Sequence, residues 1–464
     1  MRALLISTYD LGRQPFGLAS AAAALKSAGV EVRCADVSRD RLVQDDVAEA
    51  TLIGFFLPMH TATRLAVPVI RRVRELNPSA SLCAFGLYSP LNARLLTGLG
   101  VTNVLGAEFE DDLRRLALGE SAPAAPIDIP DGTQRRLAVP RVEFRVPDRT
   151  ALPPLARYAK LRVGDVVRIT GSTEASRGCK HRCRHCPIVP VYDGRFRIVP
   201  AEIVMADVRG QVAAGARHIT FGDPDFFNGI RHAVAVARAF HAEFPEISYD
   251  VTIKIEHLLA HADTLPILRD TGCAFVTSAV ESIDDDVLDK LEKGHTRAGF
   301  ERAVALCREA GLTLAPTFVA FTPWTTLEAY CSLLQGIDRL GLVEHVAPIQ
   351  LAIRLLITEG SRLLELPEIR ALVDTFDPAT MTYPWRHADP RVDLLQAQLA
   401  SLVGSRSEAS RTETFGELWT IAHAAAALEA PGLQPEILPK PTIPHLNEPW
   451  YCCAEPTTGQ TALI

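Results

Sequence analysis

Three closely spaced cysteines stand out as residues that could do chemistry. Cys179, Cys183 and Cys186 form a C-x3-C-x2-C pattern in the segment SRGCKHRCRHCPI, shortly after a predicted strand at 163–172. Thiolates this close on one loop can converge on one metal centre, as they do in iron–sulfur ligation. Three ligands leave one iron of a four-iron cube without a protein thiolate. The spacing therefore predicts an iron–sulfur site with an open position that can bind a substrate.

Zinc is the main alternative for the same loop. His181 or His185 could complete a zinc site, although structural zinc usually takes C-x2-C pairs from two separated halves. Chance clustering is the other alternative. The basic neighbours would lower the pKa of any thiolate ligand and so do not discriminate between metals; they are Lys180, Arg182 and Arg184.

A second pair of cysteines, Cys452 and Cys453, lies near the end of the chain in EPWYCCAEPTTG. Adjacent cysteines form strained disulfides, but two soft donors can jointly hold a thiophilic ion. Trp450 and Tyr451 give this tail apolar surface to bury. The remaining five cysteines stand alone, and we expect them to be small buried hydrophobic residues: Cys34, Cys83, Cys273, Cys307 and Cys331.

Length and composition limit the class of protein that positions these residues. The chain has 464 residues, of which 48% are hydrophobic and 22% charged, so we expect two or three folded domains. The net charge of −7 argues against general nucleic-acid binding. No apolar run approaches the roughly 20 residues that span a bilayer, and MRALLIST lacks the features of a signal peptide. We expect a cytoplasmic protein that does not bind membranes.

The first 120 residues alternate short apolar runs with helical patterns. Strands this apolar are usually buried on both faces of a parallel sheet, which predicts an α/β, doubly wound, Rossmann-like domain. The expected strands are 3–7, 31–37, 51–57, 81–86 and 102–106. Residues 121–160 are rich in proline and lack periodicity, which is typical of a linker.

Alternation of strands and helices returns over residues 161–365. Six strands with five helices between them predict a partial (β/α)6 barrel, with its chemistry at the carboxyl ends of the strands. The expected strands are 163–172, 218–223, 248–255, 275–280, 312–321 and 346–356. Residues 366–464 read as a mainly helical region that ends in an extended tail.

The cysteine spacing, its place after the first barrel strand and the repeats that follow resemble the radical S-adenosylmethionine (SAM) superfamily. The resemblance implies that Cys179, Cys183 and Cys186 hold a 4Fe–4S cluster whose fourth iron is chelated by SAM. An electron from a donor such as flavodoxin or ferredoxin would then cleave SAM, commonly to methionine and a 5′-deoxyadenosyl radical. His185 departs from the aromatic residue usual before the third cysteine.

The same resemblance implies SAM contacts at the ends of the second and third strands. Asp223 or Asp225 would accept a hydrogen bond from the SAM amino group, in a segment, FGDPD, that departs from the usual glycine–glycine–glutamate. An aspartate–proline turn without a ligand is the alternative. Lys254 ends the third strand and would pair with the SAM carboxylate, or form a plain salt bridge.

Further SAM contacts are implied along the fourth and sixth strands. Ser278 and Glu281, in TSAVES, would contact the ribose or carboxylate of SAM, the alternative being a buried glutamate without a ligand. Arg354 would pair with the SAM carboxylate or, equally, form a salt bridge.

A doubly wound domain ahead of such a barrel resembles the cobalamin-binding domain of the cobalamin-dependent radical SAM subgroup. FGLYSPLNARLL (85–96) and GAEFE (106–110) are similar to later loops of that domain. The D-x-H-x-x-G segment that supplies a cobalt ligand is missing, and His60, the one histidine nearby, is expected to be a surface or loop residue. The alternative is a Rossmann-like domain with a structural role only.

The tail resembles that of the CUAEP/CCAEP-tail radical SAM proteins, with Cys453 at the selenocysteine position. This implies a catalytic or substrate-holding role for Cys452 and Cys453. Three roles compete: delivery of a hydrogen atom or electron, holding a soft metal or metalloid, and ligation of cobalt or the cluster. A frayed tail without a role is the alternative.

The resemblances predict a radical SAM enzyme that transfers a methyl group with cobalamin, or another SAM-derived group without it, to a small-molecule or metalloid substrate. One variant transfers the aminocarboxypropyl group of SAM to arsenic held by the vicinal thiols. A non-catalytic iron–sulfur redox or metalloid sensor is the rival from another class.

Overall fold

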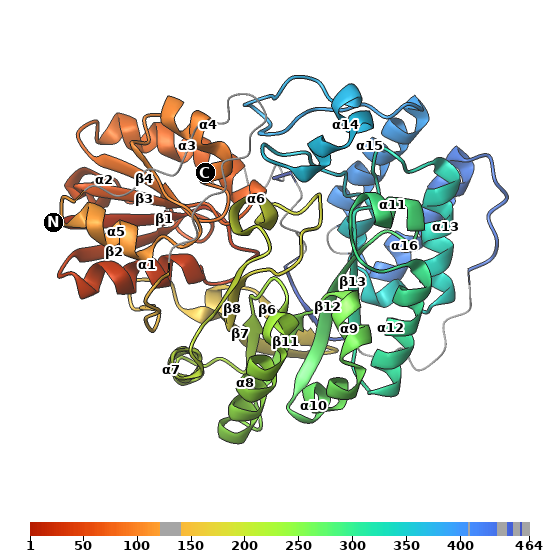
Figure 1. Ribbon diagram of the computed structural model, residues 1–464, viewed down its shortest axis with the longest axis horizontal. Helices are drawn as coiled ribbons and strands as arrows, with labels where there is room; N and C mark the ends of the chain where they lie inside the picture. The colour runs from red at the N-terminus through yellow and green to blue at the C-terminus, as the bar shows by residue number, and fades with distance from the viewer. Residues whose placement is uncertain (121–140, 407–408, 434–442, 449–454, 457–464) are drawn as a thin grey trace.

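The computed structural model describes residues 1–120, 141–406, 409–433, 443–448 and 455–456. The N-terminal domain lies to the left in Figure 1, in red and orange. The barrel lies at the lower centre in yellow and green, and the later helices lie at the right in blue. No described helix is long and apolar enough to cross a membrane.

The N-terminal domain is the expected doubly wound α/β unit. Its five parallel strands follow the order β2-β1-β3-β4-β5, and their bounds are β1 (Arg2–Ser7), β2 (Glu31–Asp36), β3 (Leu52–Phe56), β4 (Ser81–Phe85) and β5 (Asn103–Val104). Every residue of β3 is buried, as a central strand covered on both faces requires.

Helices cover both faces of this sheet. One face carries α1 (Phe16–Ser27) and α5 (Glu110–Ala117), which share a hydrophobic cluster with β1 and β4. The other face carries α2 (Gln44–Glu49), α3 (His60–Leu76) and α4 (Ala93–Gly98), packed in a second cluster. The two clusters explain why the strands read as continuous apolar runs.

The barrel is built on a curled seven-stranded sheet of order β13-β12-β11-β10-β7-β6-β14. Five of these strands are parallel: β7 (Val166–Thr173), β10 (His218–Phe221), β11 (Ser248–Thr252), β12 (Cys273–Glu281) and β13 (Leu314–Phe318). Two antiparallel strands extend it at the β7 edge, β6 (Lys160–Val163) and β14 (His445–Leu446). The C-terminal segment therefore returns to the start of the barrel.

The sixth expected barrel strand is reduced to a single parallel bridge between Phe321 and Arg354. The segment before it folds as a 3-10 turn over Pro348–Leu351. Proline lacks the backbone N–H that a central ladder needs, which accounts for a short contact in place of a strand.

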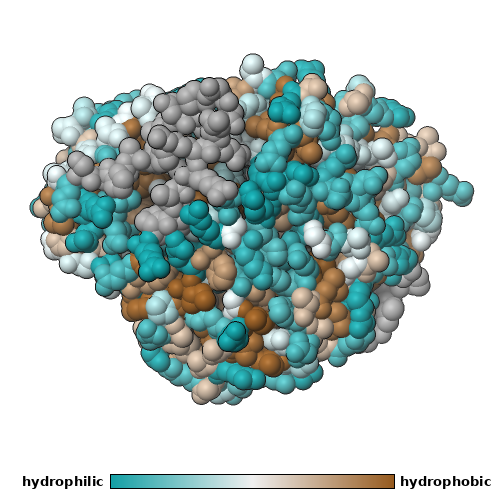
Figure 2. Space-filling view, in the orientation of Figure 1, coloured by the Kyte–Doolittle hydropathy of each residue, from teal (hydrophilic) through white to brown (hydrophobic). Residues whose placement is uncertain are grey.

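Helices pack outside the parallel strands and enclose the main hydrophobic core. They include α7 (Ala201–Ala213), α8 (Ile230–Glu243), α9 (Ile255–Ala260), α10 (Leu265–Asp270), α11 (Asp285–Lys290), α12 (Arg297–Glu309) and α13 (Leu327–Arg339). The later helices follow as expected: α14 (Pro367–Leu372), α15 (Pro390–Ser405) and α16 (Arg411–Ala425). Figure 2 shows that hydrophilic side chains cover most of the visible described surface, with smaller hydrophobic patches on its lower part.

Candidate active site

The cysteine loop connects β8 (Ser176–Gly178) to α6 (Ile188–Tyr192). Gly178 has a φ of +75°, and a Cβ there would overlap the ring of Tyr192, so the turn into the loop requires glycine. Cys183 is buried, whereas Cys179 and Cys186 are half-buried, and all three are free thiols. The three thiols are therefore largely shielded from water, and two of them stay partly accessible.

The electrostatics of the loop fit a three-thiolate cluster. Burial raises the pKa of the Cys179 thiol to about 11 and also raises that of Cys186, and the three sulfurs are close enough to affect one another. Lys254 counteracts the shift at Cys179, and Lys293 does so at Cys186. Both lysines are buried, so three thiolates would find two ammonium groups to balance their charge.

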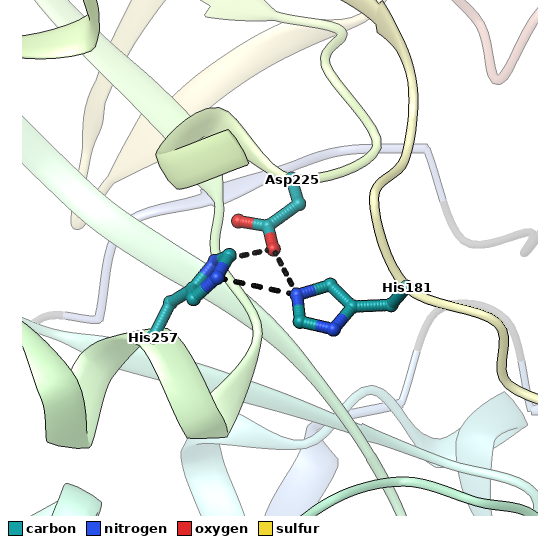
Figure 3. Close-up of side chains that lie close together, drawn as sticks. All are labelled: His181, Asp225 and His257. Atoms are coloured by element: carbon teal, nitrogen blue, oxygen red, sulfur yellow. Dashed lines mark hydrogen bonds and ion pairs between the residues drawn. The ribbon is translucent and has the colours of Figure 1, made fainter. Parts of the chain in front are cut away.

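Three side chains from separate elements converge beside this loop (Figure 3). His181 lies on the cysteine loop, Asp225 follows β10 and His257 lies on α9. The His257 Nδ1 atom is 2.6 Å from Asp225 Oδ2, and the His257 Nε2 atom is 3.2 Å from His181 Nε2. Burial would raise the pKa of Asp225, but hydrogen bonds from the two histidines outweigh it and lower that pKa.

This cluster continues toward the barrel mouth. The Lys254 ammonium is 3.2 Å from His181 Nδ1 and 2.9 Å from Glu256 Oε2. Two imidazoles and a carboxylate can hold a divalent cation, but the lysine next to His181 opposes a further positive charge. The arrangement is better suited to hydrogen bonding with a zwitterionic ligand beside the cysteine loop.

A second buried group lies at the end of β12. Glu281 has a φ of +70°, a conformation that costs energy for any residue but glycine. Its carboxylate is 3.1 Å from His185 Nε2 and 3.3 Å from Lys293 Nζ. Burial would raise the pKa of Glu281, but Lys293 and His185 lower it to about 2. The carboxylate of Glu281 thus links His185 of the cysteine loop to Lys293, the lysine beside the thiols.

Three of the six expected SAM contacts, Asp225, Lys254 and Glu281, therefore surround the cysteine loop. Asp223 is engaged elsewhere: its carboxylate accepts hydrogen bonds from Ala175 N at 2.9 Å and Ser176 Oγ at 2.6 Å. Burial raises the pKa of Asp223 to about 6. It fixes the turn that leads into β8.

The other two candidates lie away from the loop. The Ser278 hydroxyl is fully buried without a hydrogen-bond partner among the described residues, on the strand face that packs into the main core. Arg354 donates to Asp393 at 2.6 Å and to the carbonyl of Trp385 at 2.7 Å, and its guanidinium lies 3.5 Å from the centre of the Trp385 ring. Arg354 thus anchors the C-terminal helices.

A cavity of about 220 Å³ lies between the two domains. Its N-terminal wall is the carboxyl edge of the five-stranded sheet, where doubly wound domains bind ligands. Asp10, Phe16, Phe56 and Phe109 line this wall. The barrel lines the opposite wall with residues adjacent in sequence to the groups described above. They include Gly178, which precedes Cys179, and Pro224, which precedes Asp225.

A buried arginine joins the two walls of the cavity. Arg177 from β8 is 2.6 Å from Glu110 and 2.9 Å from Glu174. Its guanidinium also lies over the rings of Phe16 and Phe109. Burial raises the pKa of Glu174 to about 7.

Sequence reasoning missed several of these neighbours. His257 lies three residues after Lys254, a helical spacing that could have indicated a shared face. No local signal pointed to Lys293. The expectation that His60 is a surface or loop residue is wrong. It is the first residue of α3, and its side chain is fully buried and contacts Glu455. Cys452 and Cys453 lie outside the described residues.

Comparisons with known proteins agree with this geometry. Residues 173–324 match the model of the radical SAM superfamily. A hopanoid C-3 methylase from Methylococcus capsulatus is 26% identical over 153 residues, covering 33% of this chain and 29% of that protein. A ribosomal protein uS12 methylthiotransferase, RimO, from Geobacter sulfurreducens is 24% identical over 280 residues, covering 52% and 57%. The chain spans less than two thirds of the length of these relatives.

Solved structures extend the likeness in fold to nearly the whole chain. The radical SAM methyltransferase TsrM from Kitasatospora setae, with cobalamin and a 4Fe–4S cluster bound, has a TM-score of 0.60 at 19% identity and covers 92% of this chain and 99% of its own. The cobalamin-dependent radical enzyme OxsB has a TM-score of 0.68 at 13% identity and covers 91% and 71%.

The family match begins at the end of β7 and includes all three cysteines of the loop. Such a domain implies a 4Fe–4S cluster and SAM, and the free thiols with their two facing lysines fit that cluster. Over residues 173–324, with the three cysteines of the loop inside the matched range, this chain is therefore similar to the radical SAM superfamily.

Proposed function

We propose that the chain is a radical SAM enzyme that transfers a methyl group or another SAM-derived group to a small-molecule or metalloid substrate. The observation that carries this proposal is the cysteine loop of a radical SAM domain opening beside an interdomain cavity. Relatives named for methyl and methylthio transfer support the reaction class. An electron donor such as flavodoxin or ferredoxin is the expected partner, and the cytoplasm the expected location.

In this proposal Cys179, Cys183 and Cys186 hold the cluster, which supplies the electron that cleaves SAM. Lys254 and Asp225 orient the carboxylate and amino groups of SAM, because their charges are of the right sign and lie beside the loop. His181 lies between the two and completes their hydrogen bonding. Glu281 holds Lys293 against the thiolates.

The interdomain cavity is the proposed place for cobalamin, which would supply a methyl carrier when bound. Its aromatic wall and its position at the carboxyl edge of the sheet suit a ligand of this fold, but its volume of about 220 Å³ is smaller than a corrinoid, so binding would require this junction to open. None of the described residues that line the cavity is a histidine, so no imidazole from this lining would bind cobalt. A structural role for the N-terminal domain is the alternative.

A second candidate is transfer of the aminocarboxypropyl group of SAM to trivalent arsenic. It is favoured by the sequence of the tail, where vicinal Cys452 and Cys453 would bind a thiophilic centre. The described residues on either side, Glu448 and Glu455, contact the N-terminal domain close to the cavity. We propose a catalytic or substrate-holding role for the two cysteines on this ground.

Anaerobic reconstitution tests the proposal. Protein loaded with iron and sulfide is incubated with SAM and dithionite, with and without hydroxocobalamin or arsenite, and its products are identified by mass spectrometry. We expect 5′-deoxyadenosine, S-adenosylhomocysteine or methylthioadenosine. A cluster-loaded protein that yields none of these would be a sensor, and zinc without iron or sulfide would mean a zinc protein.

A further inference from the structure

The C-terminal segment returns to the start of the barrel through ordered contacts. Strand β14 pairs with β6, and the next residue, Asn447, exchanges two hydrogen bonds with Lys160: Asn447 N donates to Lys160 O at 3.0 Å, and Lys160 N donates to Asn447 Oδ1 at 2.7 Å. Backbone pairing of this kind fixes both the position and the direction of the chain. Residues 445–447 of the tail therefore lie against β6, at the start of the barrel.

Glu448 makes the first contact with the N-terminal domain. Tyr9 donates its hydroxyl hydrogen to Glu448 Oε1 at 3.0 Å. Gly12 lies directly against the same carboxylate, and a Cβ on this residue would overlap it. Gly12 also has a φ of +70°, a backbone conformation that favours glycine.

Glu455 makes the second contact, on α3. Its Oε1 atom is 2.9 Å from His60 Nε2, and its Oε2 atom forms an ion pair with Arg64 Nε at 3.0 Å. Burial would raise the pKa of Glu455, but His60 and Arg64 lower it. A carboxylate at the first turn of this 17-residue helix also interacts favourably with the helix dipole.

The Glu455 contact satisfies a group that is otherwise costly to bury. The His60 side chain is fully buried, and its Nδ1 atom has no hydrogen-bond partner among the described residues. Glu455 is the partner of its other ring nitrogen. Because an unpaired polar atom in the protein interior is costly, the pairing favours the docked tail.

Both contacts lie at the mouth of the interdomain cavity. Tyr9 and Gly12 follow β1, and His60 follows β3, which is the neighbour of β1 in the sheet. Leu11 and Met59, adjacent in sequence to these contacts, line the cavity itself. Glu448 and Glu455, the described residues on either side of 449–454, therefore both contact the N-terminal domain beside this cavity.

We propose that His60 and Arg64 form a docking site for Glu455, and that Glu455 is a positioning residue for the transfer reaction. The His60–Glu455 and Tyr9–Glu448 contacts each hold a described residue of the tail against the N-terminal domain. The positioning role of Glu455 rests on the proposed function. The docking of Glu455 on His60 and Arg64 rests only on the contacts described above.

Hydrogen exchange of the full-length anaerobic protein tests the docking. In Glu455→Gln and Arg64→Met we expect amide exchange of segment 443–464 to rise about tenfold, because each removes a charged partner from the contact. Arg72→Met is the matched control, since Arg72 lies on the same helix but pairs only with exposed Glu75 among the described residues. Arg64→Lys should restore much of the protection. Unchanged exchange in both test variants would overturn the docking site.

Product analysis separates this inference from the proposed function. With SAM, dithionite and arsenite, we expect Glu455→Gln to retain its cluster and to cleave SAM at the wild-type rate, while the fraction of cleavage that yields an organoarsenical falls about tenfold. Equal coupling in the variant and the wild type would refute the positioning role. If wild-type protein does not cleave SAM, the proposed function fails, whereas the exchange result still decides the docking.

Discussion

The carboxyl edges of the two sheets present different chemistry. At the barrel edge, histidines, lysines and carboxylates pair around one short loop, and the pKa values of Glu281 and Asp225 are lowered. At the N-terminal edge, aromatic rings line a cavity, and burial raises the pKa of Asp10 to about 6. The first set of groups would suit a charged ligand, and the second a mainly apolar one.

This difference shows how the work divides between the domains. Beside the cysteine loop, nearby cations keep Asp225 and Glu281 ionised, which in our proposal suits an amino-acid-like cosubstrate. At the N-terminal edge burial keeps Asp10 away from water, and Glu108 and Glu110 pair with Arg177 of the barrel domain. The tail meets this second edge, so we expect the substrate to be presented from there.

Removing one cluster ligand should have the largest effect. We expect Cys183→Ala to lose its iron, sulfide and all SAM cleavage, because two thiolates would leave two irons of the cube without a protein ligand. Iron and sulfide assays with the visible spectrum measure this. Cys34→Ala, at a lone cysteine of the N-terminal domain, should retain both. Retained iron and turnover in Cys183→Ala would contradict the assignment.

Arg177→Met should have the next largest effect, on stability. The substitution leaves Glu108 and Glu110 buried without their cation, which costs about 3–5 kcal/mol of unfolding free energy. Urea denaturation of the reconstituted protein measures it. Arg209→Met, which breaks a fully exposed pair with Glu243, is the control. A loss below 1 kcal/mol would show that the domains do not depend on Arg177.

The pH dependence of stability should differ between the two edges. Because the folded-state pKa of Asp10 is raised, its contribution favours folding at pH 4 and is lost as the pH rises through about 6. Asp10→Asn should therefore be more stable than wild type at pH 8, by up to about 3 kcal/mol, with little difference at pH 4. Glu281, whose pKa is lowered to about 2, should show the opposite sign, with stability lost below about pH 4.5. Parallel pH profiles for wild type and Asp10→Asn would contradict this distinction.

The smallest expected effect is on SAM binding. Asp225→Asn preserves shape but removes the negative charge beside His181 and His257, so we expect SAM cleavage to fall about 30-fold with the cluster retained. Glu256→Gln, at a partly exposed neighbour of Lys254, should cost less than threefold. Rates of 5′-deoxyadenosine formation distinguish them. Equal losses would mean that Asp225 is no closer to SAM than Glu256.

Local patterns predicted much of the molecule. Apolar runs located the parallel strands of both sheets, since buried parallel strands are apolar along their whole length. The antiparallel strands β6 and β14 were not predicted, and the expected strand 163–172 runs across the turn between β6 and β7. The sixth expected barrel strand is not formed, because its segment contains Pro348, which cannot donate a backbone hydrogen bond and begins a 3-10 turn. Ser278 and Arg354 lie on predicted strands, but their side chains pack away from the cysteine loop. Which face a side chain occupies depends on register, and register is set by neighbouring strands.

The amino-acid sequence by itself determined the cysteine loop, because its three cysteines lie within eight residues and need no distant partner to be recognised. Only the tertiary structure decided what surrounds that loop and where the tail meets the N-terminal domain. His181, Asp225 and His257 come from three elements, and Glu455 reaches His60 across 395 positions of sequence. Such contacts carry no local signal, because they form only when chain segments that are independent in sequence pack against one another.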